Sequence, residues 1–186
     1  NKGFSSNTSF IYYNDSASKI GSFSVQNRQS ITYDEMPQNL RDAVVSAENR
    51  TFWSDPGISV KGMSRAAFSV LRGGDVQGGS TITQQYIKVL YLSQERTMQR
   101  KLKELVLADK MGRKVPKEDI LAGYLNTIYF GRGAYGVQAA AKAYFNIDAK
   151  DLDLRQAAVL AAVLNNPTLF DPSDGPAARE RLLGRY

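Results

Sequence analysis

Residues 78–85 read Gly-Gly-Ser-Thr-Ile-Thr-Gln-Gln, and this stretch predicts the start of a helix in the middle of the chain. Thr81 and Gln84 have the spacing of a capping box, in which two side chains satisfy backbone N–H groups that the first helical turn leaves free. The glycines before them expose further N–H groups at the positive end of the helix dipole, which favours a bound anion. Glycine pairs are also ordinary turns before helices, so the loop alone does not decide a function.

Helical periodicity continues on both sides of this stretch. Toward the N-terminus, Leu40, Val44 and Ala47 form one apolar stripe of a helix, which has Glu48 near its end. Residues 1–33 are polar with short alternating runs, which is typical of an extended or hairpin lead-in. The pattern is therefore mostly α. Further helices are expected over residues 60–71, 97–111, 116–128, 134–145 and 153–164, the last with Asp153 and Gln156 as its capping pair.

The composition narrows the chemistry. The chain has 186 residues, of which 42% are hydrophobic, enough for one domain with a core. It contains no His and no Cys, which excludes a Ser-His-Asp triad, a thiolate nucleophile, a zinc site of His or Cys ligands, and any disulfide. Catalysis would need carboxylates, Lys, Tyr or hydroxyl groups. The longest apolar run, residues 157–164, has 8 residues, whereas a membrane-spanning helix needs about 20.

Positive charge is concentrated in one segment. Residues 88–117 hold nine basic residues against three acidic ones, a local charge of +6 that equals the net charge of the whole chain. The remainder of the chain is therefore neutral. A locally basic surface favours a polyanionic partner such as phosphate, nucleic acid or an anionic membrane.

Within this segment, Arg100, Lys103 and Glu104 fall on one face of the helix expected over residues 97–111, which Gly112 should end. Because apolar residues cover most of the remaining surface of that helix, we expect it to be central and its charged face to line a cleft. A solvated face with ordinary pairing of Arg100 and Glu104 is the alternative. The apolar residues expected on the opposite side are Leu102, Leu105 and Val106.

Glu48 is a candidate catalytic carboxyl because it stands shortly before Phe52 and Trp53. Aromatic bulk beside a carboxylate excludes water and makes the carboxylate a stronger base. A single Glu at the end of a helix is otherwise an ordinary surface residue, so this candidate needs the support of other motifs.

Five segments of the chain form a series. They are Glu48-Asn49-Arg50-Thr51-Phe52 with Gly57, residues 78–85, residues 100–104, residues 120–126 with Phe130-Gly131, and residues 155–167. In this order they resemble the successive motifs of the peptidoglycan glycosyltransferases, which comprise the transglycosylase domains of class A penicillin-binding proteins and the monofunctional transglycosylases. The resemblance covers about residues 30–182.

Two positions depart from the family pattern. The family usually has Asp where this chain has Asn49, and His where it has Asp55. Neither departure removes Glu48. Asn49 takes away one negative charge beside Glu48, which bears on the tuning of that carboxylate and on any metal contact there.

The resemblance implies a mostly α, lysozyme-like helical glycosyltransferase domain. It further implies polymerisation of lipid II into glycan strands, with inversion at the anomeric carbon and release of undecaprenyl diphosphate. Glu48 would be the general base that takes the proton of the attacking 4-hydroxyl. Glu104 would be the second catalytic carboxylate and would stabilise positive charge on the sugar.

The leaving diphosphate would account for the basic segment. Lys88 and Arg96 match family positions near the phosphates of the donor, and Arg100 and Lys103 would neutralise the departing charge. Mg²⁺ or Mn²⁺ would supplement them, with Glu48 as a metal contact, and no organic cofactor is expected. The other substrate-binding residues implied by the resemblance are Ser80, Thr81, Gln84, Gln85 and Asn126.

The resemblance also implies how the chain is organised. Residues 1–33 would be the extended N-terminal lead-in or linker, and residues 34–186 the glycosyltransferase domain. Within that domain, residues 58–77 would form a small membrane-apposed lobe and mobile loop, with Lys61 and Arg65 suited to lipid head groups. A core helix is the alternative for this lobe.

The expected location is the outer face of the bacterial cytoplasmic membrane. Because the chain begins with Asn1 rather than Met, we interpret it as a fragment and expect an anchoring helix upstream. The expected partners are lipid II, the growing glycan strand, the membrane surface, moenomycin-type inhibitors and a C-terminal transpeptidase domain of the full-length protein, with no nucleic acid among them.

Two other classes of function remain open at the level of sequence. A lysozyme-like peptidoglycan hydrolase would use a similar fold and a catalytic Glu, but it has no need of a diphosphate-binding basic cluster. A basic helical nucleic-acid-binding domain would explain the local charge of +6 yet leave Glu104 and the glycine loop unexplained.

Overall fold

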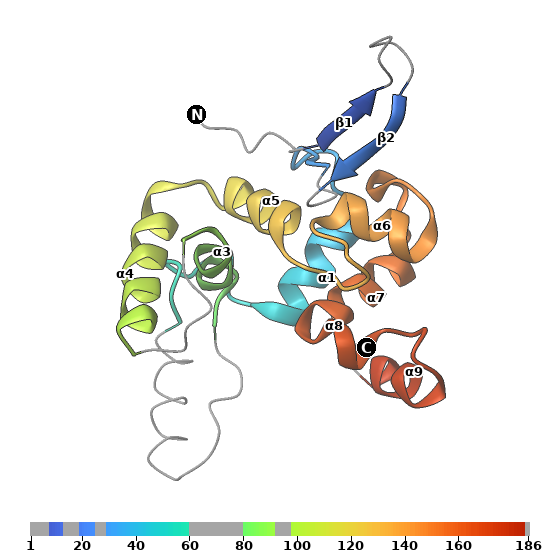
Figure 1. Ribbon diagram of the computed structural model, residues 1–186. Coiled ribbons are helices and arrows are strands. Elements are labelled where there is room, and N and C mark those ends of the chain that lie inside the picture. Colours follow the sequence, from blue (N-terminus) through green and yellow to red (C-terminus); the bar gives the residue numbers. More distant parts are fainter. Residues whose placement is uncertain (1–7, 13–18, 25–28, 60–79, 92–97, 185–186) are drawn as a thin grey trace.

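A computed structural model of the protein describes residues 8–12, 19–24, 29–59, 80–91 and 98–184. Most of these residues are helical (Figure 1), so the fold class expected from the sequence is confirmed. In chain order the elements are β1 (Thr8–Tyr12), β2 (Lys19–Ser24), α1 (Gln38–Glu48), α3 (Ile82–Tyr91), α4 (Met98–Lys114), α5 (Lys117–Thr127), α6 (Val137–Phe145), the 3-10 helix η1 (Ala149–Asp151), α7 (Leu154–Asn165), α8 (Pro167–Phe170) and α9 (Pro176–Leu183).

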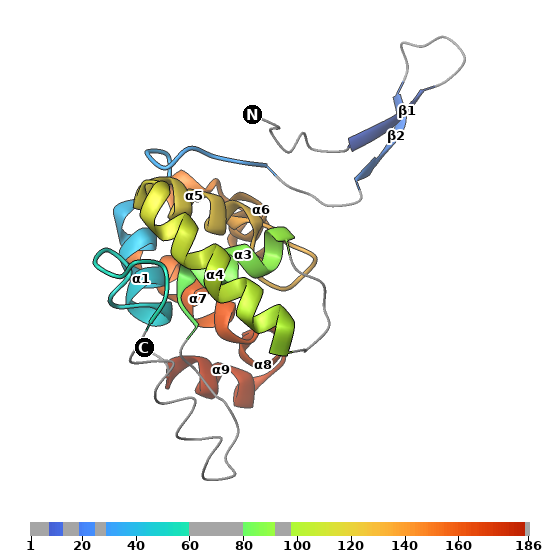
Figure 2. The same cartoon turned by 90° about the vertical axis from the view of Figure 1, so that its left-hand side faces the viewer.

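The two strands form an antiparallel hairpin that projects from the helical body (Figures 1 and 2). Thr8 lies opposite Ser24, and the register shifts between Ile11 and Tyr12. The hairpin lies in the segment for which the sequence predicts an extended or hairpin lead-in. At residues 29–37 the chain turns back to the helices and enters α1.

The core is built around α1, which packs against α7. Leu40 and Val44 of α1 are fully buried, as the helical periodicity predicts, whereas Ala47 at the end of the stripe is exposed. Burial of one stripe stabilises such a helix far more than its intrinsic propensity does. The same core takes side chains from α5, α6 and α7, among them Leu121, Tyr124, Leu125, Val137 and Leu160.

α3 lies between α4 and α5 and packs against both (Figure 1). Its start is the predicted capping box. The backbone N–H of Thr81 donates to Oε1 of Gln84 at 2.8 Å, and the N–H of Gln84 donates back to the Thr81 hydroxyl at 3.1 Å. The reciprocal bonds fix the direction in which the chain enters α3.

The C-terminal helices α8 and α9 rest on a second, smaller apolar cluster. It consists of Ala162, Val163, Phe170 and Leu182. The sequence correctly predicts that α7 ends at the Asn-Asn-Pro run, and its capping pair of Asp153 and Gln156 is present. It does not predict α8 or α9. Asn166 caps α8 and Pro167 occupies its first turn, where proline is tolerated, so the helix-stopping proline also starts a new helix.

Two predicted helix ends are wrong. α4 continues through Gly112 to Lys114, because this glycine is needed for close packing inside the helix rather than for a stop. α6 begins at Val137 instead of residue 134, because residues 129 and 135 pair in an isolated β-bridge that holds the preceding turn.

Several expectations fall on residues that the structure does not describe. They are the helix over residues 60–71, nearly all of the lobe over residues 58–77 with Lys61 and Arg65, the glycine pair at 78–79, and Arg96. Within the described ranges, no helix combines the length and apolarity that crossing a membrane requires.

Candidate active site

Glu48 is the last residue of α1 and is half-buried. Its Oε2 accepts a hydrogen bond of 3.0 Å from the side-chain amide of Gln85 on α3. The amide oxygen of Gln85 accepts a bond of 2.9 Å from the phenol of Tyr124 on α5. Three helices therefore meet at this carboxylate.

Tyr124 fixes the donor-to-acceptor direction of the hydrogen bonds that run from its phenol through Gln85 to Glu48. Its side chain is fully buried, and burial raises the pKa of the phenol far above its ordinary value, with the nearby charge of Glu48 adding to the shift. The phenol therefore stays protonated and donates to the amide oxygen of Gln85. Since the oxygen of Gln85 is occupied, its NH₂ group faces Glu48.

Glu104 on α4 is the second carboxylate, and its side chain is only 3% exposed. Its Oε1 accepts a hydrogen bond from Nζ of Lys101. Lys101 also donates, at 3.2 Å, to the hydroxyl of Ser80 just before α3. The segment 80–85 thus contacts Glu48 at one end and, through Lys101, Glu104 at the other.

α4 is oriented differently from the expectation. Arg100 and Glu104 do lie together, with Nη1 of Arg100 3.6 Å from Oε2 of Glu104, but Lys103 is exposed. Leu102 and Val106, expected to pack inside, are 63% and 62% exposed. α4 lies at the edge of the body and not at its centre (Figures 1 and 2). Periodicity predicts that α4 buries an apolar face. The structure instead buries Glu104, whose carboxylate is paired with Lys101 and Arg100.

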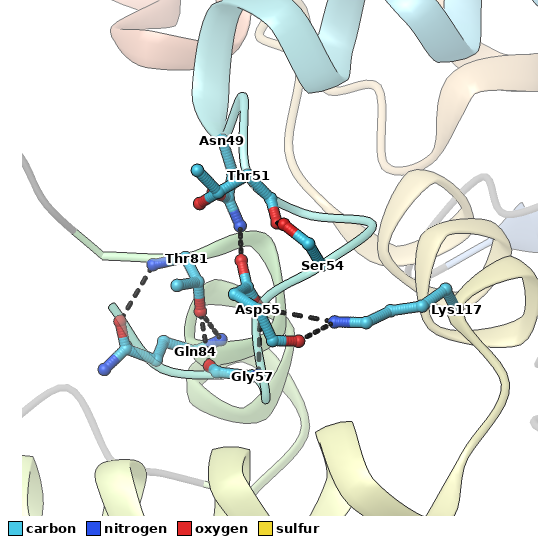
Figure 3. Close-up of polar contacts among 8 residues, drawn as sticks. All are labelled: Asn49, Thr51, Ser54, Asp55, Gly57, Thr81, Gln84 and Lys117. Atoms are coloured by element: carbon cyan, nitrogen blue, oxygen red, sulfur yellow. Dashed lines mark hydrogen bonds and ion pairs between the residues drawn. The ribbon is translucent and has the colours of Figure 1, made fainter. Parts of the chain in front are cut away.

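The loop after α1 folds around the carboxylate of Asp55 (Figure 3). Asn49 donates from Nδ2 to Oδ2 of Asp55 at 2.8 Å, and the backbone N–H of Gly57 donates to Oδ1 at 2.9 Å. Lys117, the first residue of α5, donates to Oδ1 at 3.2 Å and to the backbone oxygen of Asp55 at 2.7 Å. The hydroxyl of Thr51 donates to the amide oxygen of Asn49 at 3.1 Å.

The aromatic residues of this loop support Lys117. Phe52 is fully buried, and Nζ of Lys117 lies 4.7 Å from the centre of its ring, a cation–π contact. Trp53 packs edge-on against Phe52 and is 45% exposed. These contacts link Phe52 to Lys117 and Trp53 to Phe52. They do not test whether the two rings exclude water from Glu48, so that expectation stays a prediction.

The same loop is pressed against α4. A Cβ atom on Gly57 would come within 2.2 Å of the backbone oxygen of Ala108, and one on Gly112 within 2.3 Å of the backbone oxygen of Pro56. Gly57 also has φ +96°, in the left-handed region that favours glycine. The two glycines therefore let the loop after Glu48 approach the helix that carries Glu104.

Three predicted substrate-binding residues have internal partners. Thr81 and Gln84 form the capping box, and the Thr81 hydroxyl also donates to the backbone oxygen of Gly57 at 2.6 Å. Asn126 makes two bonds to Ile31, accepting from its N–H at 3.0 Å and donating to its carbonyl at 2.8 Å. These contacts give each residue a role in the fold, and contact with substrate stays a prediction.

Lys88 lies exposed on the last turns of α3 and is available to an anion. Of the basic cluster predicted from Lys88, Arg96 and Arg100, the structure therefore describes the two members on α3 and α4. The site as described combines two carboxylates, one half-buried and one buried, with Lys and Arg around the N-terminal part of α3.

Comparison with known proteins identifies the family. The family model described as Transglycosylase matches residues 15–184, nearly the whole chain. The chain belongs to the transglycosylase family. The match begins within the N-terminal lead-in, earlier than the start at residue 30 inferred from the motifs.

This transglycosylase chain is similar to the penicillin-binding proteins of several bacteria. It is 46% identical to penicillin-binding protein 1A of Mycobacterium tuberculosis over 154 residues, which is 81% of this chain and 19% of the relative. It is 45% identical to penicillin-binding protein 1A of Aquifex aeolicus over 89% of this chain and 22% of the relative. It is 40% identical to penicillin-binding protein 1F of Bacillus subtilis over 83% and 22%. The chain spans about a fifth of the length of these relatives.

The described part of the transglycosylase chain contains no group of three or more Asp or Glu side chains placed to hold a metal ion. Beside Glu48 stands the amide of Asn49, and the carboxylate of Asp55 is paired with Lys117. Those residues do not make a metal site by themselves, so the metal contact expected at Glu48 stays a prediction.

Three residues of this transglycosylase site were missed at the level of sequence. Lys101 stands inside the Arg-Lys-x-x-Glu motif, and its i, i+3 spacing to Glu104 was the available signal. Tyr124 stands inside the fourth motif, where its apolar neighbours suggest only a core residue. Lys117 meets Asp55 across 62 residues, and no local pattern predicts that contact.

Proposed function

We propose that this chain is a peptidoglycan glycosyltransferase that polymerises lipid II. Membership of the transglycosylase family supports the class of reaction. The observation that carries the proposal is the placement of two carboxylates against one segment, residues 80–85. Glu48 contacts it through Gln85, and Glu104 contacts it through Lys101 and Ser80.

In the proposed reaction, Glu48 accepts the proton of the 4-hydroxyl of one lipid II molecule. That oxygen forms a bond to the anomeric carbon of the growing strand, while the bond from this carbon to the diphosphate breaks, with inversion. The undecaprenyl diphosphate leaves with the bonding electrons. Gln85 holds one oxygen of Glu48, which fixes where the accepting carboxylate lies.

Glu104 is proposed to stabilise the positive charge that develops on the sugar. Its carboxylate is paired with Lys101 and Arg100, which hold it in place inside the fold. The same two cations, together with Lys88, are proposed to meet the departing diphosphate. Lys101, which contacts both Ser80 and Glu104, is added to the proposed diphosphate-binding residues, and the role expected of the exposed Lys103 stays a prediction.

The setting of the reaction is also part of the proposal. We place the chain at the outer face of the bacterial cytoplasmic membrane, where lipid II and the glycan strand would be its partners. The relatives carry the name penicillin-binding protein and are about five times as long, which supports a transpeptidase domain in the full-length protein. A moenomycin-type inhibitor would compete for the diphosphate region.

A divalent cation remains part of the expectation. Mg²⁺ is commonly bound by one or two carboxylates together with substrate phosphates, and a single Glu beside a diphosphate would suffice for such shared binding. Activity measured before and after chelation, with Mg²⁺ or Mn²⁺ added back, tests this requirement.

The decisive experiment incubates the chain with labelled lipid II in detergent and separates polymer from monomer. Polymer together with released undecaprenyl diphosphate is the expected result, and Glu48→Gln is the matched inactive control. Cleavage of preformed glycan without release of diphosphate would assign the chain to the hydrolases instead. Salt-sensitive DNA binding without either reaction would favour the nucleic-acid alternative.

A further inference from the structure

Asn49 and Asp55, in the loop after α1, are joined by a hydrogen bond. Nδ2 of Asn49 lies 2.8 Å from Oδ2 of Asp55 (Figure 3). An amide that donates to a carboxylate is a charge-assisted hydrogen bond, stronger than a bond between neutral groups. Asn49 as donor and Asp55 as acceptor therefore form one contact.

The positive charge of Lys117 near this contact is balanced by the negative charge of Asp55. We call Asn49, Asp55, Gly57 and Lys117 the Asp55 cluster. Its carboxylate receives donors from Asn49, from the backbone of Gly57 and from Lys117, and the Asp55 side chain is only 7% exposed. The side chain of Lys117 is 15% exposed. Adding or removing one charge in such a poorly solvated pair leaves a charge without compensation.

The Asp55 cluster is connected to Glu48 along two routes. Asn49 directly follows Glu48 and caps the end of α1, with its backbone N–H bonded to the carbonyl of Val45 at 2.9 Å. On the other side, the Gly57 carbonyl accepts the bond from Thr81, which begins the helix that carries Gln85. Asp55 thus fixes the residue after Glu48 and the loop that meets α3.

We propose that Asp55 is a positioning residue for Glu48 and that it acts through Asn49, so that residues 49 and 55 form an interdependent pair. The inference rests on the proposed function, in which Glu48 is the general base. A displacement of about 1 Å in a reacting group is enough to lower a rate by about 10²-fold. A change in the Asp55 cluster should therefore act on turnover more than on substrate binding.

The pair offers a test in which two damaging changes repair each other. Asn49→Asp places two carboxylates and one lysine in the cluster, whereas Asp55→Asn leaves the lysine without a carboxylate. The double variant keeps one amide and one carboxylate with donor and acceptor exchanged, and its total charge equals that of the wild type. Amide and carboxylate have nearly the same shape, so the substitutions change charge and hydrogen bonding but hardly change side-chain volume.

The experiment measures kcat and KM for lipid II polymerisation in the chain and in these three variants. We expect each single change to lower kcat by about 10- to 100-fold with KM altered less than about threefold. The double variant should recover to within about fivefold of the wild type. Independent sites would instead multiply their losses.

Asp171→Asn is the matched control, because Asp171 is also an ion-paired carboxylate but contacts Arg132. It should leave kcat unchanged, and combining it with Asn49→Asp should give no recovery. Thermal unfolding of every variant separates loss of fold from loss of position. If Asn49→Asp does not fold, Asn49→Ala serves in its place, since it removes the donor without adding charge and should also lower kcat at constant KM.

Each outcome bears on a different claim. Single variants, or Asn49→Ala, that retain wild-type kcat overturn the positioning role while the proposed function stands. Losses that multiply in the double variant overturn the interdependence of the pair. A wild-type chain that releases no diphosphate from lipid II removes the proposed function, and this inference with it.

Discussion

At the scale of single residues, the two carboxylates of the site differ in what surrounds them. Glu48 is half-buried, and the donor that the structure gives to its Oε2 is the neutral amide of Gln85. Glu104 is buried and held by the cations Lys101 and Arg100. These surroundings fit the proposed roles, in which Glu48 takes the proton of the attacking hydroxyl and Glu104 stabilises positive charge on the sugar.

Glu48→Gln is expected to abolish polymerisation while leaving the fold intact, because the amide has the same shape but cannot accept the proton. Loss of a general base commonly lowers a rate by about 10²- to 10⁴-fold. Lipid II polymerisation gives the rate, and a thermal unfolding curve gives the fold. More than half of the wild-type rate would assign the base to another residue.

Glu104→Gln is expected to lower the rate by about 10²-fold, and raising the pH should not restore it, because the proposed role is electrostatic. The variant should also lose about 1 to 3 kcal/mol in the free energy of unfolding, since Lys101 keeps only a neutral partner at position 104. A pH series of the polymerisation rate checks the first statement. A profile that simply shifts along the pH axis would contradict it.

At the scale of the helix, α4 offers a matched pair of lysines. Lys101→Met and Lys103→Met each remove one positive charge, but Lys101 contacts Ser80 and Glu104 whereas Lys103 is exposed. A charge-assisted hydrogen bond contributes about 1.5 to 3 kcal/mol, so Lys101→Met should lower polymerisation about 10- to 150-fold. Lys103→Met should lower it far less. Equal losses in the two variants would show that only the overall charge matters.

The packing of the loop on α4 makes a second prediction about this helix. Gly112→Ala should reduce the free energy of unfolding by about 1 to 3 kcal/mol, because the new Cβ would lie 2.3 Å from the backbone oxygen of Pro56. Inside an unobstructed helix the same change would stabilise by about 1 kcal/mol. Urea denaturation of the wild type and of the variant gives the change in the free energy of unfolding. Gly184→Ala is the control, since its Cβ would lie 3.6 Å from the nearest atom outside its neighbours and should not destabilise.

Local signals in the sequence predicted those elements whose causes are local. The capping boxes at Thr81 and Asp153 correctly marked the starts of α3 and α7. Gly112 was wrongly predicted to end the helix. A glycine is needed there because the backbone of Pro56, distant in the sequence, packs closely against it. The predicted orientation of α4 was wrong because periodicity assigns apolar residues to the core, whereas here Glu104 is buried and paired with Lys101 and Arg100.

At the scale of the whole molecule, the C-terminal helices are tied to the rest by an ion pair. Nε of Arg132 donates to Oδ2 of Asp171 at 2.8 Å, and the guanidinium also stacks 4.0 Å from the ring centre of Tyr144. The hydrogen bond from Arg132 lowers the pKa of Asp171 from 3.8 to about 2. Ionised Asp171 therefore stabilises the folded state.

This stabilisation has a defined pH window. It is fully present above about pH 4, where Asp171 is ionised in the unfolded chain as well, and it is lost as the pH falls toward 2. Asp171→Asn should therefore unfold at a lower temperature than the wild type at pH 6, and the difference should shrink to nearly nothing near pH 2. Melting curves of both proteins across this range provide the measurement. A difference that stays constant with pH would contradict the role of the ion pair.

The two hydrogen bonds between Asn126 and Ile31 would transmit force if the N-terminal segment were pulled. They join residues 95 positions apart, and Asn126 stands two residues after Tyr124, whose phenol supports Gln85. A pull on the segment before Ile31 would be carried to α5 through these two bonds as well as along the chain to α1. A force on the N-terminal segment would thus be transmitted to α5, whose Tyr124 supports the Gln85 side chain that holds Glu48.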